Sequence, residues 1–502
     1  MDAIFLNGGI QWPMLSRSIG PYKVAHWIRK HGHTCQVIDY VDRMTEDQLV
    51  AVIKKFITAN TKIIGFSSTF LSNNIYKWKN KASYRIPEHF ILAIKRIRKE
   101  YPHIKIANGG YMADRVSGWN VVDVSIMSYT AASEDVFLEY LNHLKSGTPP
   151  PLGRIISPGM LKGEKVKSRM LYDTAREPKY NIESDDFQFI LQDCILPGEP
   201  LPLDISRGCI FACKFCQYPH LGKKKMDYVR GMEYLEQEIR YNYEKFGTTG
   251  YYLLDDTFND TEFKVKAFYD MTQRLPFKIT FSSYLRADLL YTFPDSALVL
   301  QEAGLTGAYH GIESFHPEAS KIIGKAWSGK HGKEFLPKLY HDIWKNQVPM
   351  HTNFIVGITG DTPQNIIDTV DWYVGNEMHS IQFSNLGLFG PNSKGSRYTM
   401  LSEFDKNADK YGYTFTEESK EGFSRWKNDN WTATSSTIAA NKANASVSKI
   451  TKMGSWIIQA ALWSGVNKQS VMTTAMNDLD WVTISASSDQ KMEQYYNMLM
   501  SQ

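Results

Sequence analysis

Short apolar runs alternate with amphipathic stretches twice along this chain, and this alternation constrains the fold more than any other feature. In the first series the apolar runs predict strands, and the stretches with apolar residues on one face predict helices. The predicted strands are Ala3–Leu6, Cys35–Tyr40, Lys62–Phe66, Ile104–Ala107 and Val121–Met127, and the predicted helices are Tyr22–Lys30, Glu46–Ile57, Glu88–Lys99 and Glu134–Lys145. This spacing favours a parallel, doubly wound sheet that binds ligands at the carboxyl ends of its strands.

A second series of alternating elements follows a proline-rich break. Its six predicted strands are Leu203–Ser206, Tyr251–Leu254, Ile279–Ser283, Ala308–Ile312, Thr352–Val356 and Ile381–Asn385. Six such units favour a sheet that curls into a partial barrel, with its chemistry at the carboxyl ends of the strands. The sequence therefore predicts four regions: a first domain at 1–147, a connector at 148–200, a barrel at 201–390 and a mostly helical region at 391–502.

Composition sets the broad class of the protein. The chain has 502 residues, enough for about three domains. It is 43% hydrophobic and 22% charged, which excludes a disordered chain. A net charge of +4 argues neither for nucleic acid nor for a membrane surface. We find no signal peptide and no apolar stretch of the roughly 20 residues that a membrane span needs, so we expect a cytoplasmic protein.

Three of the five cysteines form a cluster. Cys35 and Cys194 are isolated, whereas Cys209, Cys213 and Cys216 follow directly on a predicted strand. Three thiolates in one loop can hold three irons of a cubane cluster and leave the fourth iron open. A structural zinc site with His220 as the fourth ligand, or three unrelated buried thiols, are the alternatives. The spacing favours iron–sulfur.

The cluster motif and three later segments together resemble one family. The Cys-x3-Cys-x2-Cys motif, with Phe215 before its last cysteine, resembles the radical S-adenosylmethionine (SAM) superfamily. Residues 253–259, 303–314 and 353–362 resemble the second, fourth and fifth strands of the branch that also carries cobalamin domains. In the last of these segments Thr359 and Asp361 stand where that branch usually has proline and glutamate. The resemblance covers roughly residues 201–390.

The resemblance implies a [4Fe–4S] cluster on Cys209, Cys213 and Cys216, with SAM chelating the fourth iron. It implies SAM-binding roles at the strand ends: Asp255 and Asp256 for the amino group, Arg286 for the carboxylate, Glu313 and Ser314 for the ribose or methionine end, and Val356 and Gly357 for adenine. The structural alternatives are a helix N-cap at Asp255, Asp256 or Glu313, a surface ion pair at Arg286 and a turn at Gly357. No catalytic residue is assigned beyond the cluster ligands.

The first domain resembles the cobalamin-binding domains that are fused to radical SAM barrels. Residues 16–33 are similar to their opening motif, and Ser67, Gly109 and Gly110 match strand ends where backbone approaches a large planar cofactor. The Asp-x-His-x-x-Gly motif of the lower ligand is absent, and residues 127–131 replace the usual Gly-x-Gly-Glu. The alternative is a retained fold that only packs or recognises substrate.

These features predict an α/β protein with a Rossmann-like sheet, a partial (β/α)6 radical SAM barrel and a mainly helical C-terminal region. We expect it to cleave SAM to a 5′-deoxyadenosyl radical and to modify an unactivated carbon, by cobalamin-dependent methyl transfer. The alternatives are a radical rearrangement or cyclisation without methyl transfer, and a non-enzymatic iron–sulfur or zinc-stabilised protein. Methylthiolation of tRNA is disfavoured because it needs three further cysteines in the first domain.

Two kinds of partner follow from this interpretation. A reductant such as a flavodoxin or ferredoxin would deliver the electron that SAM cleavage requires. Nucleic acid is the weaker expectation; it rests on Lys223–Lys225 and on the lysines around Trp78, where basic side chains stand beside an aromatic ring.

Overall fold

The computed structural model divides the chain into two compact units. It describes residues 1–9, 14–71, 75–78, 81–84, 87–110, 113, 121–126, 132–156, 160–161, 164–165, 168–172, 179, 181–217, 223, 227–325, 327, 329–391, 401–417, 424–475 and 481–502. The first unit comprises residues 1–202, 241–247 and 485–502, and the second comprises residues 203–240 and 248–484.

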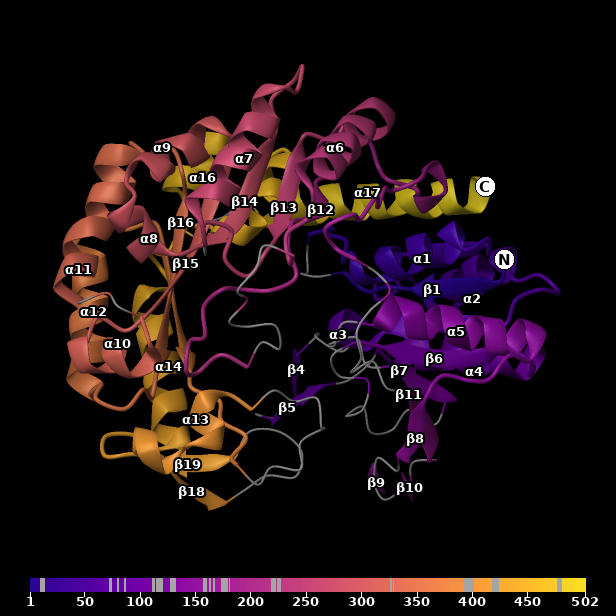
Figure 1. Ribbon diagram of the computed structural model, residues 1–502, viewed down its shortest axis with the longest axis horizontal. Helices are drawn as coiled ribbons and strands as arrows, with labels where there is room; N and C mark the ends of the chain where they lie inside the picture. Colours follow the sequence, from indigo (N-terminus) through magenta and orange to yellow (C-terminus); the bar gives the residue numbers. More distant parts are fainter. Residues whose placement is uncertain are drawn as a thin grey trace. The chain divides into compact units, whose positions relative to one another are not determined.

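The first unit is built on a mostly parallel sheet with the order β2-β1-β3-β6-β7-β11-β8 (Figure 1). Its strands are β1 (Ala3–Leu6), β2 (Cys35–Ile38), β3 (Ile63–Ser67), β6 (Lys105–Gly109), β7 (Val124–Ile126), β8 (Gly153–Ile156) and β11 (Arg169–Tyr172). The first five pair in parallel and confirm the predicted doubly wound sheet, and every residue of β1 and β2 is buried. β11 adds to β7 in parallel and β8 pairs antiparallel with β11, so a segment predicted as connector extends this sheet.

Helices cover both faces of this sheet. They are α1 (Gly20–Lys30), α2 (Glu46–Phe56), the short α3 (Ser68–Leu71), α4 (Glu88–Glu100) and α5 (Ser133–Ser146). α1 packs with α5, and α2 packs with α4. Right-handed crossovers require this split, because the chain moves outward across the sheet through α1 and back through α2. A capping box starts α2, in which Thr45 Oγ1 accepts a hydrogen bond from the Gln48 amide at 3.2 Å.

A buried arginine connects three distant segments within the first unit. Arg17 forms 2.6 Å ion pairs with both Asp39, just beyond β2, and Glu199. The Asp39 amide donates to the hydroxyl of Tyr495, which lies in the last helix, α17 (Trp481–Ser501). Burial raises the pKa of Asp39 to about 6, against the opposing effect of Arg17. The network fixes residues near both ends of the chain to the same sheet.

The second unit is built on a six-stranded sheet in sequence order, from β12 to β17. Its strands are β12 (Leu201–Asp204), β13 (Gly250–Leu254), β14 (Thr280–Leu285), β15 (Leu305–Glu313), β16 (Met350–Val356) and β17 (Ser380–Asn385). The pairings from β13 to β17 are all parallel. The six strands in sequence order agree with the predicted partial (β/α)6 barrel, and β12 and β17 are its two open edges.

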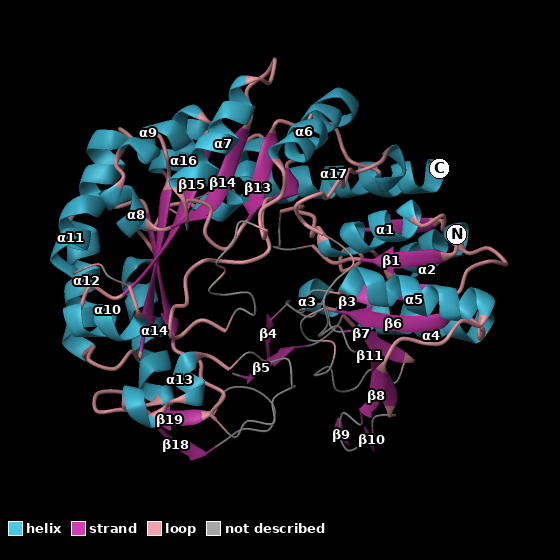
Figure 2. Ribbon diagram, in the orientation of Figure 1, coloured by secondary structure: helices cyan, strands magenta, loops and turns pink. Residues whose placement is uncertain are grey.

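Helices line the outer side of the barrel strands (Figure 2). They are α6 (Met232–Phe246), α7 (Glu262–Gln273), α8 (Ala287–Thr292), α9 (Asp295–Glu302), α10 (Pro317–Ile323), α11 (Gly329–Pro337), a π-helical turn at Lys338–Ile343 and α12 (Pro363–Gly375). Sequential strands joined by helices need connections of one hand, which place the helices on one side. The carboxyl ends of the strands therefore share one edge with the loops that follow them.

The C-terminal region is mainly helical, as predicted, and adds a small hairpin. Its elements are α13 (Glu403–Lys406), β18 (Thr414–Glu417), β19 (Arg425–Lys427), α14 (Ala433–Val447), α15 (Ile458–Trp463), α16 (Lys468–Thr473) and α17. The side chain of Gln459 hydrogen-bonds Thr280 and Thr306, at the starts of β14 and β15. This segment therefore packs against the amino end of the barrel, whereas α13 lies beside the cysteine loop at the other end, where the Phe404 amide donates to the Lys214 carbonyl at 3.0 Å. Among the described helices, none is both long and apolar enough to cross a membrane.

Candidate functional site

The three clustered cysteines line one cavity at the carboxyl end of the barrel strands. The cavity has a volume of about 200 Å³. The loop that carries the three cysteines follows directly on β12. Cys209 is buried, with 5% of its surface exposed, whereas Cys213 and Cys216 are half-buried. Burial raises the pKa of the Cys209 thiol, against the opposing hydrogen bond with Thr257. A buried thiolate at this position therefore needs a positive partner such as bound iron.

The spacing of the sulfurs bears on which metal they can hold. Tetrahedral zinc at about 2.3 Å from each thiolate brings ligand sulfurs within about 3.8 Å of one another. In the described part of the chain, only one group of three His, Cys, Asp or Glu side chains has all its ligand atoms within 4.8 Å, and it is not the cysteines. The three sulfurs therefore do not all lie close enough together to be the ligands of one tetrahedral zinc ion. His220, the alternative zinc ligand, lies outside the described residues.

Two adjacent aspartates at the end of β13 have different surroundings. The Asp255 carboxylate is buried, accepts a hydrogen bond from the Thr257 amide and forms a 2.9 Å ion pair with Lys264. Asp256 is exposed and lines the cysteine cavity. The N-cap of α7 is Thr261, so the helix-cap alternative for these aspartates is wrong. Of these two aspartates, Asp256 alone lines the cavity where a ligand could bind.

Arg286, at the end of β14, reaches the cysteine loop. Its Nε and Nη2 donate to the two oxygens of Asp288, at 3.0 and 2.5 Å, and its Nη1 lies 3.7 Å from Cys213 Sγ. Burial lowers its pKa, but the hydrogen bonds and charge of Asp288 outweigh this and leave the pKa raised. The side chain is only 9% exposed, so the predicted alternative of a surface ion pair is wrong in its location.

Glu313 and Ser314 diverge at the end of β15. Glu313 lines the cavity, and its Oε1 pairs with Lys325 Nζ at 2.9 Å. Its backbone is left-handed, with φ +68°, a strained conformation for a residue with a side chain. Ser314 instead donates to Asp361 at 2.7 Å and does not line this cavity. His316 is the N-cap of α10, so Glu313 does not cap that helix.

The two residues predicted to pack against adenine lie outside the described cavity. Val356 is fully buried in the core. Gly357 has φ +115°, and a Cβ there would lie 2.6 Å from Trp426. The turn and the close approach of Trp426 already require glycine, in agreement with the structural alternative. Their role toward SAM stays a prediction.

The cavity also contains residues for which the sequence predicted no individual role. They are Phe211, Phe215, Thr257, Tyr284, Leu285, Tyr309, Gly311 and Lys325. The two phenylalanines lie between the cysteines, and Tyr284 lies two residues before Arg286, so proximity to the motifs was their only signal. Lys325 follows α10, and its Nζ donates a hydrogen bond to the Gly311 carbonyl. No sequence motif predicts this contact.

The predicted cobalamin positions lie side by side at the carboxyl edge of the first sheet. Ser67 at the end of β3 pairs with Gly109 at the end of β6. A Cβ at Gly109 would lie 3.3 Å from the ring of Phe137, and Gly110 has φ +108°. The local structure therefore favours glycine at both positions, whether or not a cofactor binds there. Ser67 is half-buried. Residues 127–131, at the end of the fifth predicted strand, are not among those described.

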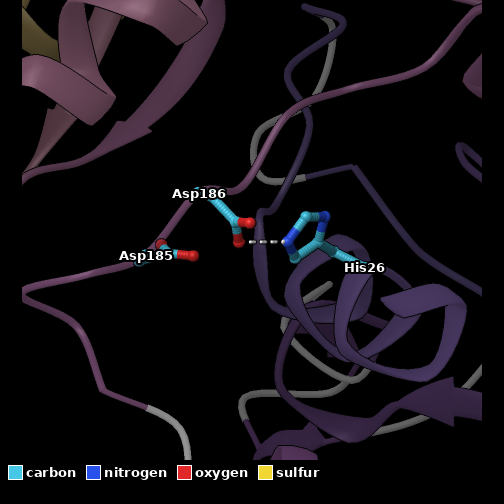
Figure 3. A group of neighbouring side chains, drawn as sticks. All are labelled: His26, Asp185 and Asp186. Atoms are coloured by element: carbon cyan, nitrogen blue, oxygen red, sulfur yellow. Dashed lines mark hydrogen bonds and ion pairs between the residues drawn. The ribbon is translucent and has the colours of Figure 1, made fainter. Parts of the chain in front are cut away.

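The one compact group of potential metal ligands in the described residues is His26, Asp185 and Asp186 (Figure 3). Each carboxylate already has a cationic partner: Lys23 pairs with Asp185, and Lys30 pairs with Asp186 at 2.8 Å. His26 Nε2 lies 3.1 Å from Asp186, and burial lowers the pKa of the histidine. This arrangement is an ion-pair network that joins α1 to the segment before β12.

Comparison with known proteins identifies the second unit. Residues 203–373 match the model of the radical SAM superfamily. The structure of the radical SAM methyltransferase TsrM from Kitasatospora setae, with tryptophan substrate and a SAM analogue bound, matches 98% of each chain at 13% identity and a TM-score of 0.62. The cobalamin-dependent SAM radical enzyme OxsB, with aqua-cobalamin and SAM bound, matches 98% of this chain and 66% of its own at 15% identity and a TM-score of 0.54. Curated protein sequences give no match. Residues 203–373 are therefore a radical SAM domain, and nearly the whole chain has a fold similar to that of cobalamin-dependent radical SAM enzymes.

Proposed function

We propose that this protein cleaves SAM reductively at a [4Fe–4S] cluster held by Cys209, Cys213 and Cys216, and that it uses cobalamin to methylate an unactivated carbon. The observation that carries the proposal is the convergence of three thiols, Asp256 and Glu313 on one cavity at the carboxyl end of the barrel. When bound, the cluster would supply the electron that breaks the C5′–S bond of SAM.

The chain's own residues would bind and orient SAM. Asp256 presents a carboxylate to a cationic or iron-bound amine, which favours a short charge-assisted hydrogen bond. Glu313 is held by Lys325 and accepts a long contact from Asn353 at 3.5 Å, and a carboxylate fixed in this way could accept hydrogen bonds from the ribose hydroxyls of SAM. Tyr284 and Tyr309 pack edge to face at 4.7 Å beside the cavity and limit the access of water.

Methyl transfer is the finer part of the proposal. It is supported by the fold shared with TsrM, a radical SAM methyltransferase, and with OxsB, which has been solved with aqua-cobalamin. The paired strand ends at Ser67 and Gly109 offer the first unit's edge as the cobalamin site. Radical rearrangement or cyclisation remains the second candidate. The chain shares its fold with OxsB as well, and OxsB is a cobalamin-dependent SAM radical enzyme that is not described as a methyltransferase.

The test is anaerobic reconstitution with iron and sulfide, followed by reductant, SAM and hydroxocobalamin, because reduced cobalamin without a methyl group can accept the methyl group of SAM. We expect 5′-deoxyadenosine, S-adenosylhomocysteine and a corrinoid absorbance band that stays with the protein through gel filtration. A Cys213→Ala variant, prepared in the same way, should give none of the 5′-deoxyadenosine. If 5′-deoxyadenosine forms without S-adenosylhomocysteine or retained corrinoid, rearrangement replaces methyl transfer. If SAM stays intact, the chain is an iron–sulfur protein without this activity.

A further inference from the structure

The guanidinium of Arg286 contacts Asp288 and the ring of Phe211, and one of its nitrogens lies beside Cys213, a proposed cluster ligand. Asp288 binds Nε and Nη2 in a bidentate pair and so occupies one of the two edges through which the guanidinium could bind a carboxylate. The remaining nitrogen, Nη1, lies 3.7 Å from Cys213 Sγ. A second carboxylate could bind Arg286 only through Nη1 and the remaining hydrogen of Nη2, the edge that lies beside Cys213.

The position of Arg286 is fixed by its backbone and by its ring contact. Its amide donates to Asn259 Oδ1 at 2.8 Å, and Asn259 Nδ2 donates to its carbonyl at 2.9 Å. The guanidinium carbon lies 3.9 Å from the centre of the Phe211 ring, inside the cysteine loop. With Asp288 on one edge and Phe211 on one face, the cation is held beside Cys213.

A fixed cation beside a ligand sulfur affects the two redox states of a cluster unequally. Reduction adds one negative charge to the iron, sulfide and thiolate group. A positive charge near a ligand thiolate therefore stabilises the reduced state more than the oxidised state. Hydrogen bonds to the sulfurs and the net charge around a cluster are among the factors that set its potential. The negative charge of Asp288 opposes the stabilisation of the reduced state. Asp288 contacts Nε and Nη2 of Arg286, however, whereas Nη1 is the nitrogen beside the sulfur.

We propose that Arg286 is a positioning residue that raises the reduction potential of the cluster through Cys213, rather than a ligand of the SAM carboxylate. The proposal rests on the proposed function, because it requires the cluster to be present. It makes the cluster easier to reduce by a physiological donor, and it revises the role that the sequence motif implied for this arginine.

The test is a redox titration of reconstituted protein without SAM, followed by electron paramagnetic resonance. Arg286→Met removes the charge and keeps the length of the side chain. At a fixed potential we expect it to lower the ratio of reduced to oxidised cluster about tenfold, which equals a shift of about 59 mV for one electron. Arg286→Lys keeps the charge and should stay closer to the wild-type ratio. Asp288→Asn removes the opposing negative charge and should shift the ratio the other way.

SAM affinity, measured by calorimetry on the oxidised cluster, separates the two roles of Arg286. We expect Arg286→Met to change it less than about threefold, whereas loss of a charge-assisted hydrogen bond would cost at least about tenfold. Unchanged reduced-to-oxidised ratios in both Arg286→Met and Asp288→Asn would overturn the proposal. So would a tenfold loss of SAM affinity in Arg286→Met with an unchanged ratio. If wild-type protein assembles no cluster, the proposed function fails instead, and the two failures are thereby distinguished.

Discussion

Asp255 and Asp256 are adjacent but have different surroundings, so we expect substitutions at the two positions to have opposite effects on stability and on SAM binding. Asp255→Asn should weaken the fold around α7 and leave SAM affinity nearly intact. Asp256→Asn should leave the fold intact and weaken SAM binding. The reason is that Asp255 is buried against Lys264, whereas Asp256 is exposed to the cavity.

The magnitude follows from the contacts of Lys264. Its Nζ is fully buried and contacts Asp255 at 2.9 Å, Asp260 at 2.8 Å and the Thr257 carbonyl at 3.0 Å. Breaking a buried ion pair costs about 3–5 kcal/mol, and since Asp260 remains as a partner we expect about 3 kcal/mol for Asp255→Asn. Asp256→Asn, at an exposed position, should change stability by less than about 0.5 kcal/mol.

Amide hydrogen exchange over β13 and α7 measures the local stability without assuming that the whole chain unfolds in one step. A loss of 3 kcal/mol corresponds to roughly a hundredfold faster exchange in Asp255→Asn. Calorimetry on reconstituted protein should show SAM affinity about tenfold lower in Asp256→Asn and within about threefold of wild type in Asp255→Asn. Wild-type protection together with a large loss of SAM affinity in Asp255→Asn would refute this reasoning.

Three further predictions concern the cluster, the barrel and the turn after β16. Cys216→Ser should lose most of the bound iron after reconstitution, while Cys35→Ser retains it, as measured by iron analysis; equal iron content would contradict the ligand assignment. Burial lowers the pKa of His310 to about 4, below its unfolded value of about 6.5, so it contributes stability that is present above pH 6.5 and lost as the pH falls toward 4. His310→Gln should remove up to about 3 kcal/mol of the stability that the protein loses between pH 7 and pH 4. Thermal unfolding of the apoprotein at the two pH values measures this loss, and an unchanged pH dependence would argue against a buried neutral histidine. Gly357→Ala should lower stability by about 2 kcal/mol or more because Trp426 and the positive φ exclude a Cβ, whereas Gly375→Ala, with open space around it, should be tolerated; equal melting temperatures would contradict this.

The sequence could predict both sheets because each strand is a short apolar run and each helix has an apolar face. It could not predict that residues 153–156 and 169–172 extend the first sheet. These are four-residue strands beside an edge, set among prolines, and too short to show a period. Residues 169–172 are stabilised by pairing with β7, which is distant in sequence, and residues 153–156 then pair with residues 169–172.

The candidate site shows the same division between local and distant information. The cysteine spacing is local, so it could be recognised directly. The different surroundings of Asp255 and Asp256 depend on which one faces Lys264, nine residues later on another element. Lys325 reaches Glu313 only because α10 folds back over the end of β15. Such contacts are products of tertiary packing and leave no motif in the chain.

The central claim, a cluster with one iron open to SAM, is tested most directly by electron paramagnetic resonance of the reduced, anaerobically reconstituted protein. We expect about four irons and four sulfides per chain and a spectrum whose g values change when SAM is added. A chain that takes up zinc in place of iron, or a reduced cluster whose spectrum is the same with and without SAM, would contradict the account.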